Sequence, residues 1–551
     1  MGIPSYFSYI VRNYTHIIRK LDTYYLRVDR FYLDSNSIIY DVIKSRKSQS
    51  TLTDDSIITE VIDKIGEYIK MISPKKLVYI AFDGVAPIAK LEQQRQRRYK
   101  SWYQCKLMRS FNDTSTASSI EWNTCQITPG TRFMNELNKR IKRHFEDPAI
   151  ITFYQVENIM VSTSDDIGEG EHKIFHYIRQ LSVDANIDID KDETHVVYGL
   201  DADLIMLSIN HLPIFPKIYL FRETPEFIKS IQQDLEPNET YLMDIYELAH
   251  IITLQMSDRK EATSAQTQIQ THKSNKIYIY DYIFMCFFLG NDFMPHFPSL
   301  NIRTGGITKI LNAYSETIGK NVAVLTDGHT IYWNNVLLLL KWLSNNEETM
   351  FIDEMTLRNR KERNGRNIPE DTPENKWRKI DNIPTYEREL EKYIQPNKDG
   401  WRRRYYRSLF HLKTKDMEEE IPLIVLNYLE GLEWTMRYYT KDCIDWTWKY
   451  KYSYPPLLCD LYKYGRQYIH KIQFKKQTTA VSELVQLCYV VPYSGLEFVP
   501  IKLRKYLSQY RDLYPDNCEF IWAFCRYFWE AHAELPELSI SFIEDAVSKC
   551  K

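Results

Sequence analysis

VSTSDDIGEGEHKIFHYIR, residues 161–179, is the most informative stretch of this sequence. Glu169 and Glu171 stand two residues apart at the start of a predicted helix that runs from His172 to about Leu181. The glycines beside them let the backbone turn tightly. A single acid at a helix start is common, because it complements the helix dipole. A pair of carboxylates bracketed by glycines is less easily explained in that way, and it favours a metal site over a cap.

Three apolar runs elsewhere in the chain each lead into an aspartate. These are residues 31–33 before Asp34, residues 77–82 before Asp83, and residues 196–200 before Asp201 and Asp203. Continuous apolar runs are typical of strands buried on both faces in parallel sheets, and the ligands of such sheets bind beyond the carboxyl ends of the strands. One strand-terminal Asp is usually a turn residue or a cap. Several of them together predict carboxylates that meet at one edge of one sheet.

The order of the elements defines the fold class. A further apolar run, Ala149–Val156, is interpreted as a strand without a terminal acid. Helical, charged segments separate the runs, and the resulting order β, α, β, α predicts an α/β domain with a mostly parallel, twisted sheet flanked by helices. In residues 283–300, IFMCFFLGNDFMPHFPSL, an apolar helix runs into Asp292, which becomes the seventh candidate of the acidic set.

A basic helix is predicted directly after Asp83, over residues 89–109, AKLEQQRQRRYKSWYQCKLMR. Four of its side chains share an arc of about 100° on one helix face: Lys90, Gln94, Arg97 and Arg98. Most charged runs of this kind form a solvated face. Here Glu92 is the only acid among many bases, and a compact cationic face beside an acidic cluster suits a terminal phosphate.

Composition restricts the class of protein further. At 551 residues the chain holds two or more core-forming units. Its formal net charge of −2 gives no global field that would attract a polyanion, although a local basic patch still could. Nine cysteines without a CxxC pair indicate a reducing compartment and no structural zinc. No apolar run is long enough to span a bilayer, and we expect an intracellular protein, in the cytoplasm in preference to the nucleus.

With these motifs in place, the sequence closely resembles the XRN family of 5′→3′ exoribonucleases along nearly its whole length. The blocks that resemble the family's first conserved region are MGIPSYFSYI, YLDSNSIIY, FDGVAPIAKLEQQRQRRYKS, CQITPGTRFM, GEGEHKIFHYIR, YGLDADLIMLSI and CFFLGNDFMPHFPSL. Those that resemble the second are GWRRRYYRSLF, YLEGLEWTMRYY, DWTWKYKYSYPPLLCDL, LVQLCYVVP and WEAHAELPELSISFIEDAV. Both sets follow the family's order.

The resemblance implies a domain plan. A nuclease domain with a PIN/FEN-like core is expected over residues 1–345, and an aromatic-rich, mainly helical second region over 401–551 packs against it. Residues 346–400 are rich in charge, Asn and Pro with little periodicity, and are interpreted as a polar linker or surface excursion. Because the chain ends soon after the second conserved region, we expect a minimal catalytic core.

The resemblance also implies the site, position by position. The family's seven acidic residues, which are both catalytic and metal-binding, match Asp34, Asp83, Glu169, Glu171, Asp201, Asp203 and Asp292. Its 5′-phosphate pocket matches Lys90, Gln94, Arg97 and Arg98. The family usually carries a His where this chain has Tyr40, and an aromatic ring there still offers a stacking face. Trp446 or Trp448 would form the other wall of the base stack.

Such a site implies two divalent cations, Mg²⁺ or Mn²⁺, because close carboxylates raise one another's pKa until hard cations relieve the repulsion. Paired metals can activate a water and stabilise a leaving oxygen. The expected substrate is uncapped single-stranded RNA with a 5′-monophosphate, hydrolysed stepwise to nucleoside 5′-monophosphates in RNA degradation or processing. No membrane and no further small-molecule cofactor is expected.

Two alternatives remain open at this point. A flap-endonuclease-like DNA enzyme would share the acidic site and the GEGE motif, but it would not be expected to match the second-region blocks or the QQRQRRYKS helix so closely. A catalytically silent RNA-binding scaffold would be expected to lack one or two of the acids, and all seven are present.

Overall fold

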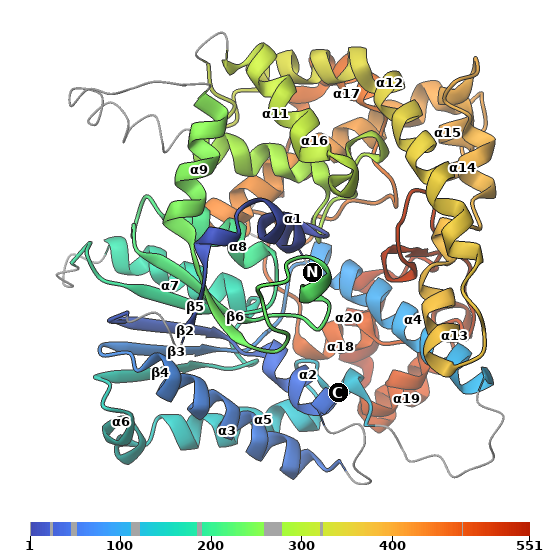
Figure 1. Ribbon diagram of the computed structural model, residues 1–551. Helices are drawn as coiled ribbons and strands as arrows, with labels where there is room; N and C mark the ends of the chain where they lie inside the picture. The colour runs from blue at the N-terminus through green and yellow to red at the C-terminus, as the bar shows by residue number, and fades with distance from the viewer. Residues whose placement is uncertain are drawn as a thin grey trace, which may run out of the picture.

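The structure is a computed structural model that describes residues 2–21, 26–45, 52–111, 122–183, 190–257, 278–319, 323–475 and 478–550. Its first half is built on a seven-stranded sheet of order β1-β7-β6-β5-β2-β3-β4 (Figure 1). The strands are β1 (Ile18–Lys20), β2 (Arg30–Asp34), β3 (Leu77–Ala81), β4 (Asn158–Ser162), β5 (His195–Tyr198), β6 (Ile218–Glu223) and β7 (Thr240–Asp244). The five strands from β6 to β4 are parallel, whereas β7 and β1 add antiparallel neighbours at one edge.

The central strands β2, β3 and β5 are buried on both faces, which is why they are continuous apolar runs. In β2, Phe31 and Leu33 point into one core while Tyr32 points into the other. The first core lies between the sheet and α2 (Asn36–Ser45), α3 (Asp54–Ile72) and α5 (Arg132–Phe145). The second lies between the opposite face of the sheet and α7 (Gly170–Val183), α8 (Asp203–His211) and α9 (Ile245–Ser257). Figure 1 shows α3 and α5 below the sheet and α7 to α9 above it. The predicted α/β fold is confirmed.

The strand order reverses beside β2, and this position sets the location of the site. From β2 the chain goes outward to β3 and β4, and then returns to the other flank of β2 with β5. Helices that follow neighbouring strands therefore leave a crevice between β2 and β5, and such switch points bind ligands in α/β sheets.

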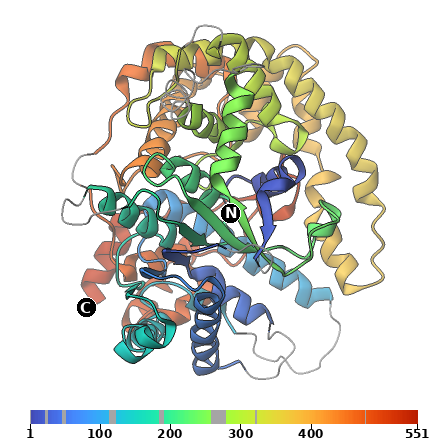
Figure 2. The ribbon, with the colours of Figure 1, turned by 60° about the vertical axis from the view of Figure 1, so that its left-hand side comes forward.

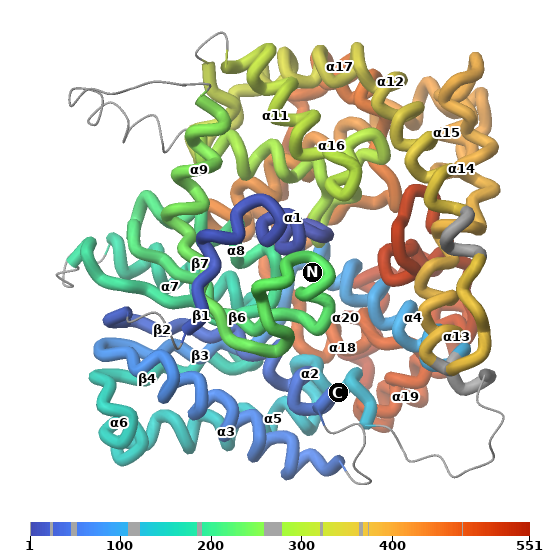
Figure 3. Tube along the Cα trace, viewed as in Figure 1, coloured from blue at the N-terminus to red at the C-terminus, as the bar shows by residue number. Residues whose placement is uncertain are grey.

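The second region is mainly helical and covers the top and right of the molecule in Figures 1 and 3. Figure 2 shows the same ribbon turned by 60° about the vertical axis. Its helices are α11 (Gly306–Thr317), α12 (Trp333–Arg366), α13 (Pro373–Asp381), α14 (Glu389–Ile394), α15 (Trp401–Leu409), α16 (Met417–Thr440), α17 (Leu458–Tyr468), α18 (Glu483–Val490), α19 (Ile501–Leu507) and α20 (Ile540–Cys550). A short ribbon joins β8 (Phe520–Ile521) to β9 (His532–Ala533). Helices α12, α16 and α17 share the larger apolar core with the upper face of the sheet.

The sequence interpretation was wrong for Ala149–Val156, which is not a strand. Most of it forms α6 (Pro148–Tyr154), and the true strand is β4, immediately downstream. The Asp147 side chain accepts a hydrogen bond from the Ala149 amide, and Pro148 occupies the first turn. These local start signals favour a helix, and they outweigh the β-branched residues that suggested a strand.

The structure also differs from the linker expected over residues 346–400. Helix α12 runs without a break through residue 345, where a domain boundary was predicted, and α13 and α14 follow it. The charged residues here are not all solvated: Arg358, Arg388 and Glu391 are buried together. A stretch with mutually paired charges folds as part of the core in spite of its polar composition.

All nine cysteines lie in the described ranges and are free thiols. Among the helices that the structure describes, none combines the length and the apolar character that a membrane crossing requires.

Candidate active site

Six of the seven predicted acids sit at the carboxyl ends of the parallel strands or on the helices that follow them. Asp34 is the last residue of β2, Asp83 stands two residues beyond β3, and Asp201 three residues beyond β5. Glu169 and Glu171 flank the first residue of α7, which follows β4, and Asp203 is the first residue of α8. The seventh, Asp292, lies three residues beyond the end of the 3₁₀-helix η5 (Phe287–Leu289).

Asp83 fixes the geometry between two strand ends. Its Oδ1 accepts a hydrogen bond of 2.7 Å from the Gly170 amide, and its Oδ2 accepts one of 2.6 Å from Asn36 Nδ2. The Asp83 amide in turn donates to Asn36 Oδ1 at 3.1 Å. Asn36 therefore links the end of β3 to the start of α2. Sequence reasoning missed Asn36, although its place two residues after Asp34 in the block YLDSNSIIY was a usable signal.

Gly170 is required by the close approach of Asp34. A Cβ at residue 170 would lie 2.4 Å from Asp34 Oδ1, so any side chain there would displace the carboxylate. Asp34 Oδ1 is buried and has no hydrogen-bond partner among the described residues. Burial, together with the charge of Asp83, raises the pKa of Asp34 to about 8. A buried carboxylate oxygen without a partner is destabilising unless a ligand or water meets it.

Lys90 brings Asp292 into the cluster. Its ammonium contacts Glu169 Oε1 at 2.5 Å and Asp292 Oδ2 at 2.8 Å, and all three side chains are almost completely shielded from solvent. Burial alone would raise the pKa of Asp292, but the Lys90 charge overcomes it and holds that pKa well below its usual range. The ion pair thus joins α4 (Ile88–Phe111) to two acids from distant parts of the chain.

Glu171 and Asp203 complete the buried set. Burial raises the pKa of both carboxyls, that of Asp203 to about 6, and the neighbouring acids add to the shift. Asp203 Oδ1 lacks a hydrogen-bond partner within the described ranges, as Asp34 Oδ1 does. Asp201 lies at the rim, where its Oδ1 accepts a hydrogen bond of 3.3 Å from the Asp203 amide. Burial and mutual repulsion disfavour the ionised form of these acids, and a bound cation would stabilise that form.

An aromatic wall from the second region closes the site. Tyr438 of α16 donates a hydrogen bond of 2.8 Å to Glu169 Oε2, and its ring lies 3.5 Å, centroid to centroid, from that of His172. Glu169, Glu171 and His172 each offer a ligand atom, and these atoms lie within 4.8 Å of one another. Sequence reasoning did not single out His172 or Tyr438. His172 directly follows the second Glu of the GEGE motif, whereas nothing local to Tyr438 signals its role.

Lys173 anchors the loops beneath the acids. Its ammonium donates to the carbonyl oxygens of Phe82 and Thr163, at 2.8 and 2.7 Å. Burial lowers the pKa of Lys173 to about 8. Because Phe82 precedes Asp83 and Thr163 follows β4, this side chain ties together two strand ends that carry acids into the site.

The four predicted phosphate-binding residues occupy adjacent turns of α4, and two of them, Lys90 and Gln94, are buried. Arg98 Nη2 donates to Thr128 Oγ1 at 2.6 Å and to the Ile127 carbonyl at 3.3 Å. Arg98 Nη1 is buried without a partner in the part of the chain that the structure describes. A guanidinium oriented by one edge and unsatisfied at the other suits an anion, since phosphate oxygens accept bidentate hydrogen bonds from Arg.

The three predicted stacking residues differ in exposure. Tyr40 on α2 is 38% exposed. Trp446 is half-buried, and its carbonyl accepts a hydrogen bond of 3.0 Å from the Ile88 amide at the start of α4. Trp448 is 7% exposed and stacks on Trp434 with centroids 5.1 Å apart. Its ring is a core element, so of the two tryptophans Trp446 is the better placed to meet a base.

Buried carboxylates at the strand ends, with a guanidinium on the next helix, suit phosphodiester chemistry and place the molecule among the α/β nucleases. The sequence matches two protein-family models. The one described as the XRN 5′-3′ exonuclease N-terminus matches residues 1–224, and the one described as the Xrn1 helical domain matches residues 272–385 and 370–550. Together they cover most of the sequence. The chain belongs to the XRN 5′-3′ exonuclease family.

Curated relatives agree over nearly the whole chain. The 5′-3′ exoribonuclease 2 homolog of Drosophila melanogaster is 26% identical, over 97% of this chain and 69% of its own length. The 5′-3′ exoribonuclease 1 of Homo sapiens is also 26% identical, over all of this chain and 34% of its own length. That of Saccharomyces cerevisiae is 24% identical, over 94% and 41%. The chain thus spans about two thirds of the first relative and well under half of the other two.

Proposed function

We propose that this chain is a 5′→3′ exoribonuclease that uses divalent cations to hydrolyse single-stranded RNA bearing a 5′-monophosphate, one nucleotide at a time. The observation that carries the proposal is the meeting of Glu169 and Asp292 at the Lys90 ammonium. It joins the acid cluster to the helix whose next turns carry Gln94, Arg97 and Arg98. The 5′ end of the RNA would therefore be held beside the phosphodiester that is hydrolysed.

The residues fit two Mg²⁺ or Mn²⁺ ions. Two buried carboxylate oxygens, of Asp34 and Asp203, have no partner in the described chain, and the donor set is dominated by oxygen, as hard cations require. We assign the ligands to the seven acids Asp34, Asp83, Glu169, Glu171, Asp201, Asp203 and Asp292. When bound, such ions lower the pKa of a water and stabilise the leaving oxygen of an in-line displacement.

Side chains of the protein recognise the 5′ end of the RNA and hold it in position. Arg98 is oriented by Thr128 and would hold the 5′-phosphate through its guanidinium. Tyr40 and Trp446 would stack on the first bases, and base stacking is tolerant of sequence. Tyr438 orients Glu169. With the end of the chain held by its phosphate, the first phosphodiester lies over the acids and the product is a nucleoside 5′-monophosphate. We place the activity in intracellular RNA degradation or processing, in the cytoplasm ahead of the nucleus.

The direct test compares one RNA with a 5′-monophosphate, a 5′-hydroxyl or a cap, with and without Mg²⁺. We expect rapid release of mononucleotides from the 5′-phosphorylated RNA with Mg²⁺ only, and resistance of the capped RNA, because a cap is too bulky for a phosphate pocket. Equal digestion of all three, or preferential cleavage of branched DNA, would contradict the proposal.

Arg98→Ala should narrow the preference for 5′-phosphorylated over 5′-hydroxyl RNA. A hydrogen bond to a charged group contributes about 1.5–3 kcal/mol, so we expect the ratio of kcat/KM values to fall by at least about tenfold, mainly through the phosphorylated substrate. Lys106→Ala is the matched control, because Lys106 is a cation on the same helix that contacts Asn517 at the surface. The pocket assignment fails if both variants retain the wild-type ratio.

Binding of Mg²⁺ should strengthen as the pH rises from 6 to 8.5. The pKa of Asp34 is raised to about 8 and that of Asp203 to about 6, so in this range protons compete with the cation for the carboxylates. Calorimetry in two buffers of different ionisation enthalpy should show proton release on binding, larger at pH 7 than at pH 8.5. In Asp34→Asn the pH dependence should flatten. An affinity that does not change with pH would count against these ligands.

A further inference from the structure

The Lys90 ammonium binds two of the acids that we assign as metal ligands. It contacts Glu169 Oε1 at 2.5 Å and Asp292 Oδ2 at 2.8 Å. The side chain of Lys90 is 10% exposed and those of the two acids are each 4% exposed, so little water screens the three charges. Burial alone would lower the pKa of Lys90, but the charges of Asp292 and Glu169 raise it, which keeps the side chain a cation. A divalent cation bound to either acid would therefore meet a like charge, and the two would repel.

The second oxygen of Glu169 is also engaged, but by a group that is fixed in place. Tyr438 donates to Glu169 Oε2 at 2.8 Å. Its ring is held between that of His172, with centroids 3.5 Å apart, and that of Trp434, with centroids 4.7 Å apart. Lys90 stands in the first turn of α4 and ends in an ammonium on a flexible stem of four carbons. Of the two groups that bind Glu169, Lys90 is therefore the one that can yield to a cation.

The proposed phosphate-binding face of α4 lies within electrostatic range of the same acids. Burial would raise the pKa of Asp292, and the charges of Lys90 and of Arg97 lower it. Gln94 lies one turn after Lys90 on this helix, and Arg98 one turn further along the same face. A phosphate held by Arg98 would thus offer the Lys90 ammonium a second set of anionic oxygens beside its own helix.

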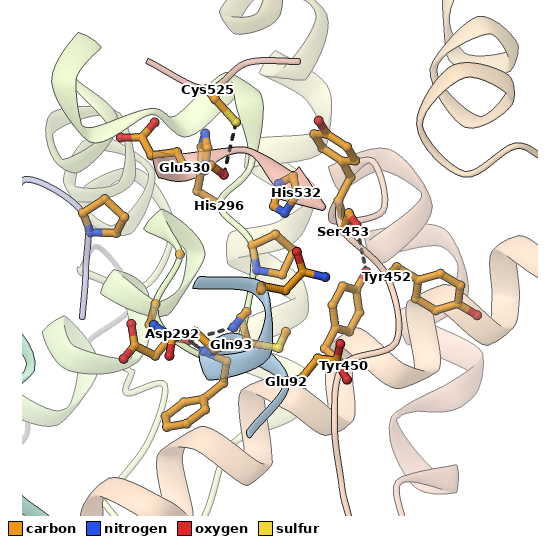
Figure 4. Close-up of a pocket in the computed structure, with 18 of the residues that line it drawn as sticks. Glu92, Gln93, Asp292, His296, Tyr450, Tyr452, Ser453, Cys525, Glu530 and His532 are labelled. Carbon is orange, nitrogen blue, oxygen red and sulfur yellow. Dashed lines mark hydrogen bonds between the residues drawn. The ribbon is translucent and has the colours of Figure 1, made fainter. Parts of the chain in front are cut away.

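The acid cluster borders a cavity that opens to the surface. Asp292 lines this cavity of about 610 Å³, whose other walls come from α4, from residues 449–454 and from the β8–β9 ribbon (Figure 4). The exposed residues Lys451 and Glu534 also line it. A cavity of this volume holds many waters, because one water needs about 10–15 Å³ of it. Water and ions can therefore approach Asp292 without crossing the packed core.

We propose that Lys90 exchanges partners when the substrate binds: it leaves Glu169 and Asp292 to a divalent cation and turns its ammonium to the 5′-phosphate that Arg98 holds. The inference rests on the proposed function, which supplies both the cation and the phosphate. Lys90 is repelled by the cation and attracted by the phosphate, so each of the two favours binding of the other. Metal binding and recognition of the 5′ end are therefore coupled, and the coupling is reciprocal.

The test measures Mg²⁺ binding to the full chain by calorimetry, with and without saturating adenosine 5′-monophosphate. This nucleotide carries a 5′-phosphate but no phosphodiester to hydrolyse, and adenosine is the control without a phosphate. We expect adenosine 5′-monophosphate, and not adenosine, to tighten Mg²⁺ binding by about tenfold, within the usual range for coupled sites. Saturating Mg²⁺ should tighten binding of the nucleotide by the same factor. Blank titrations correct for Mg²⁺ bound by free nucleotide.

Lys90→Met removes the competing ammonium. Without nucleotide, this variant should bind Mg²⁺ about tenfold more tightly than the wild type, because the acids no longer have to be vacated first. Adenosine 5′-monophosphate should not tighten its Mg²⁺ binding further. Lys90→Gln is also uncharged, should behave in the same way, and replaces Lys90→Met if that variant does not fold.

Arg98→Met is the matched control. Arg98 is a cation of the same helix, but its guanidinium contacts Thr128 Oγ1 and the Ile127 carbonyl, whereas Lys90 contacts carboxylates. This variant should bind adenosine 5′-monophosphate more weakly and should bind Mg²⁺ without nucleotide as the wild type does.

The exchange is rejected if adenosine 5′-monophosphate leaves the Mg²⁺ affinity of the wild type unchanged, or if Lys90→Met binds Mg²⁺ no more tightly than the wild type. It is also rejected if the nucleotide tightens Mg²⁺ binding equally in both proteins, which would mean that the phosphate contacts the cation directly. Digestion of 5′-phosphorylated RNA by the same wild-type preparation separates the two levels. Release of mononucleotides without coupling would reject the exchange alone, whereas no release would reject the proposed function.

Discussion

Asp203→Ala should abolish RNA hydrolysis while RNA binding in EDTA survives. Asp203 is the first residue of α8, is buried, and presents an oxygen without a partner among the described residues. Removing one electrostatic contributor from a reacting centre lowers kcat by about 10²–10³-fold or more. We expect a loss of at least that size in mononucleotide release from 5′-phosphorylated RNA. Affinity for RNA should change little, because the cationic groups of α4 are untouched.

The same substitution should leave the metal-free protein at least as stable as the wild type. Burial and the charge of Asp292 raise the pKa of Asp203, which means that the folded protein disfavours its ionised form. Asp244→Ala is the matched control: Asp244 is the last residue of β7, directly before α9, and its carboxylate accepts a hydrogen bond of 3.0 Å from the Glu247 amide. That variant should lose about 1 kcal/mol of stability and no activity. Wild-type turnover by Asp203→Ala would remove the basis for the metal assignment.

The positions of six of the seven acids were predictable because these residues obey a local rule, which Asp292 does not. Asp34, Asp83 and Asp201 each follow a buried apolar run, and parallel strands bring their carboxyl ends to one edge whatever their separation in sequence. Glu169 and Glu171 can be recognised in the sequence by the glycines that stand beside them. Even the wrong assignment of 149–156 left the site intact, because the true strand β4 lies a few residues downstream and still leads into the GEGE motif.

The partners supplied by the second region could not be predicted in this way. Tyr438 lies 269 residues from Glu169 in the sequence, and no spacing rule links them. The buried charges of α12 and α14 are a similar case. Composition indicates a solvated linker at 346–400, because charged residues are rarely buried. Whether a charge finds its counter-charge inside the protein depends on how distant helices pack, and that information is not local.

Glu391→Ala should be strongly destabilising, although Glu391 lies outside the active site. Glu391 Oε1 accepts hydrogen bonds from Arg358 Nη2 at 2.5 Å and from the Phe524 amide at 2.7 Å. Its Oε2 accepts from Arg358 Nε at 2.8 Å and from Arg388 Nε at 2.7 Å. One carboxylate thus pairs with two buried guanidiniums and holds the connection between β8 and β9 through the Phe524 amide. Removing it leaves uncompensated buried charge, which costs about 3–5 kcal/mol.

The measurement is the midpoint of chemical denaturation, followed by circular dichroism, for Glu391→Ala beside Glu389→Ala. Glu389 belongs to the same helix α14 but is exposed in its first turn, so its loss should remove only a few tenths of a kcal/mol of helix-dipole stabilisation. Double substitution of Arg358 and Glu391 by Met should recover part of the loss, since it removes one of the two buried guanidiniums that lose the Glu391 carboxylate. If Glu391→Ala and Glu389→Ala unfold at the same denaturant concentration, residues 346–400 act as a surface excursion after all, and the buried ion pairs contribute nothing to the fold.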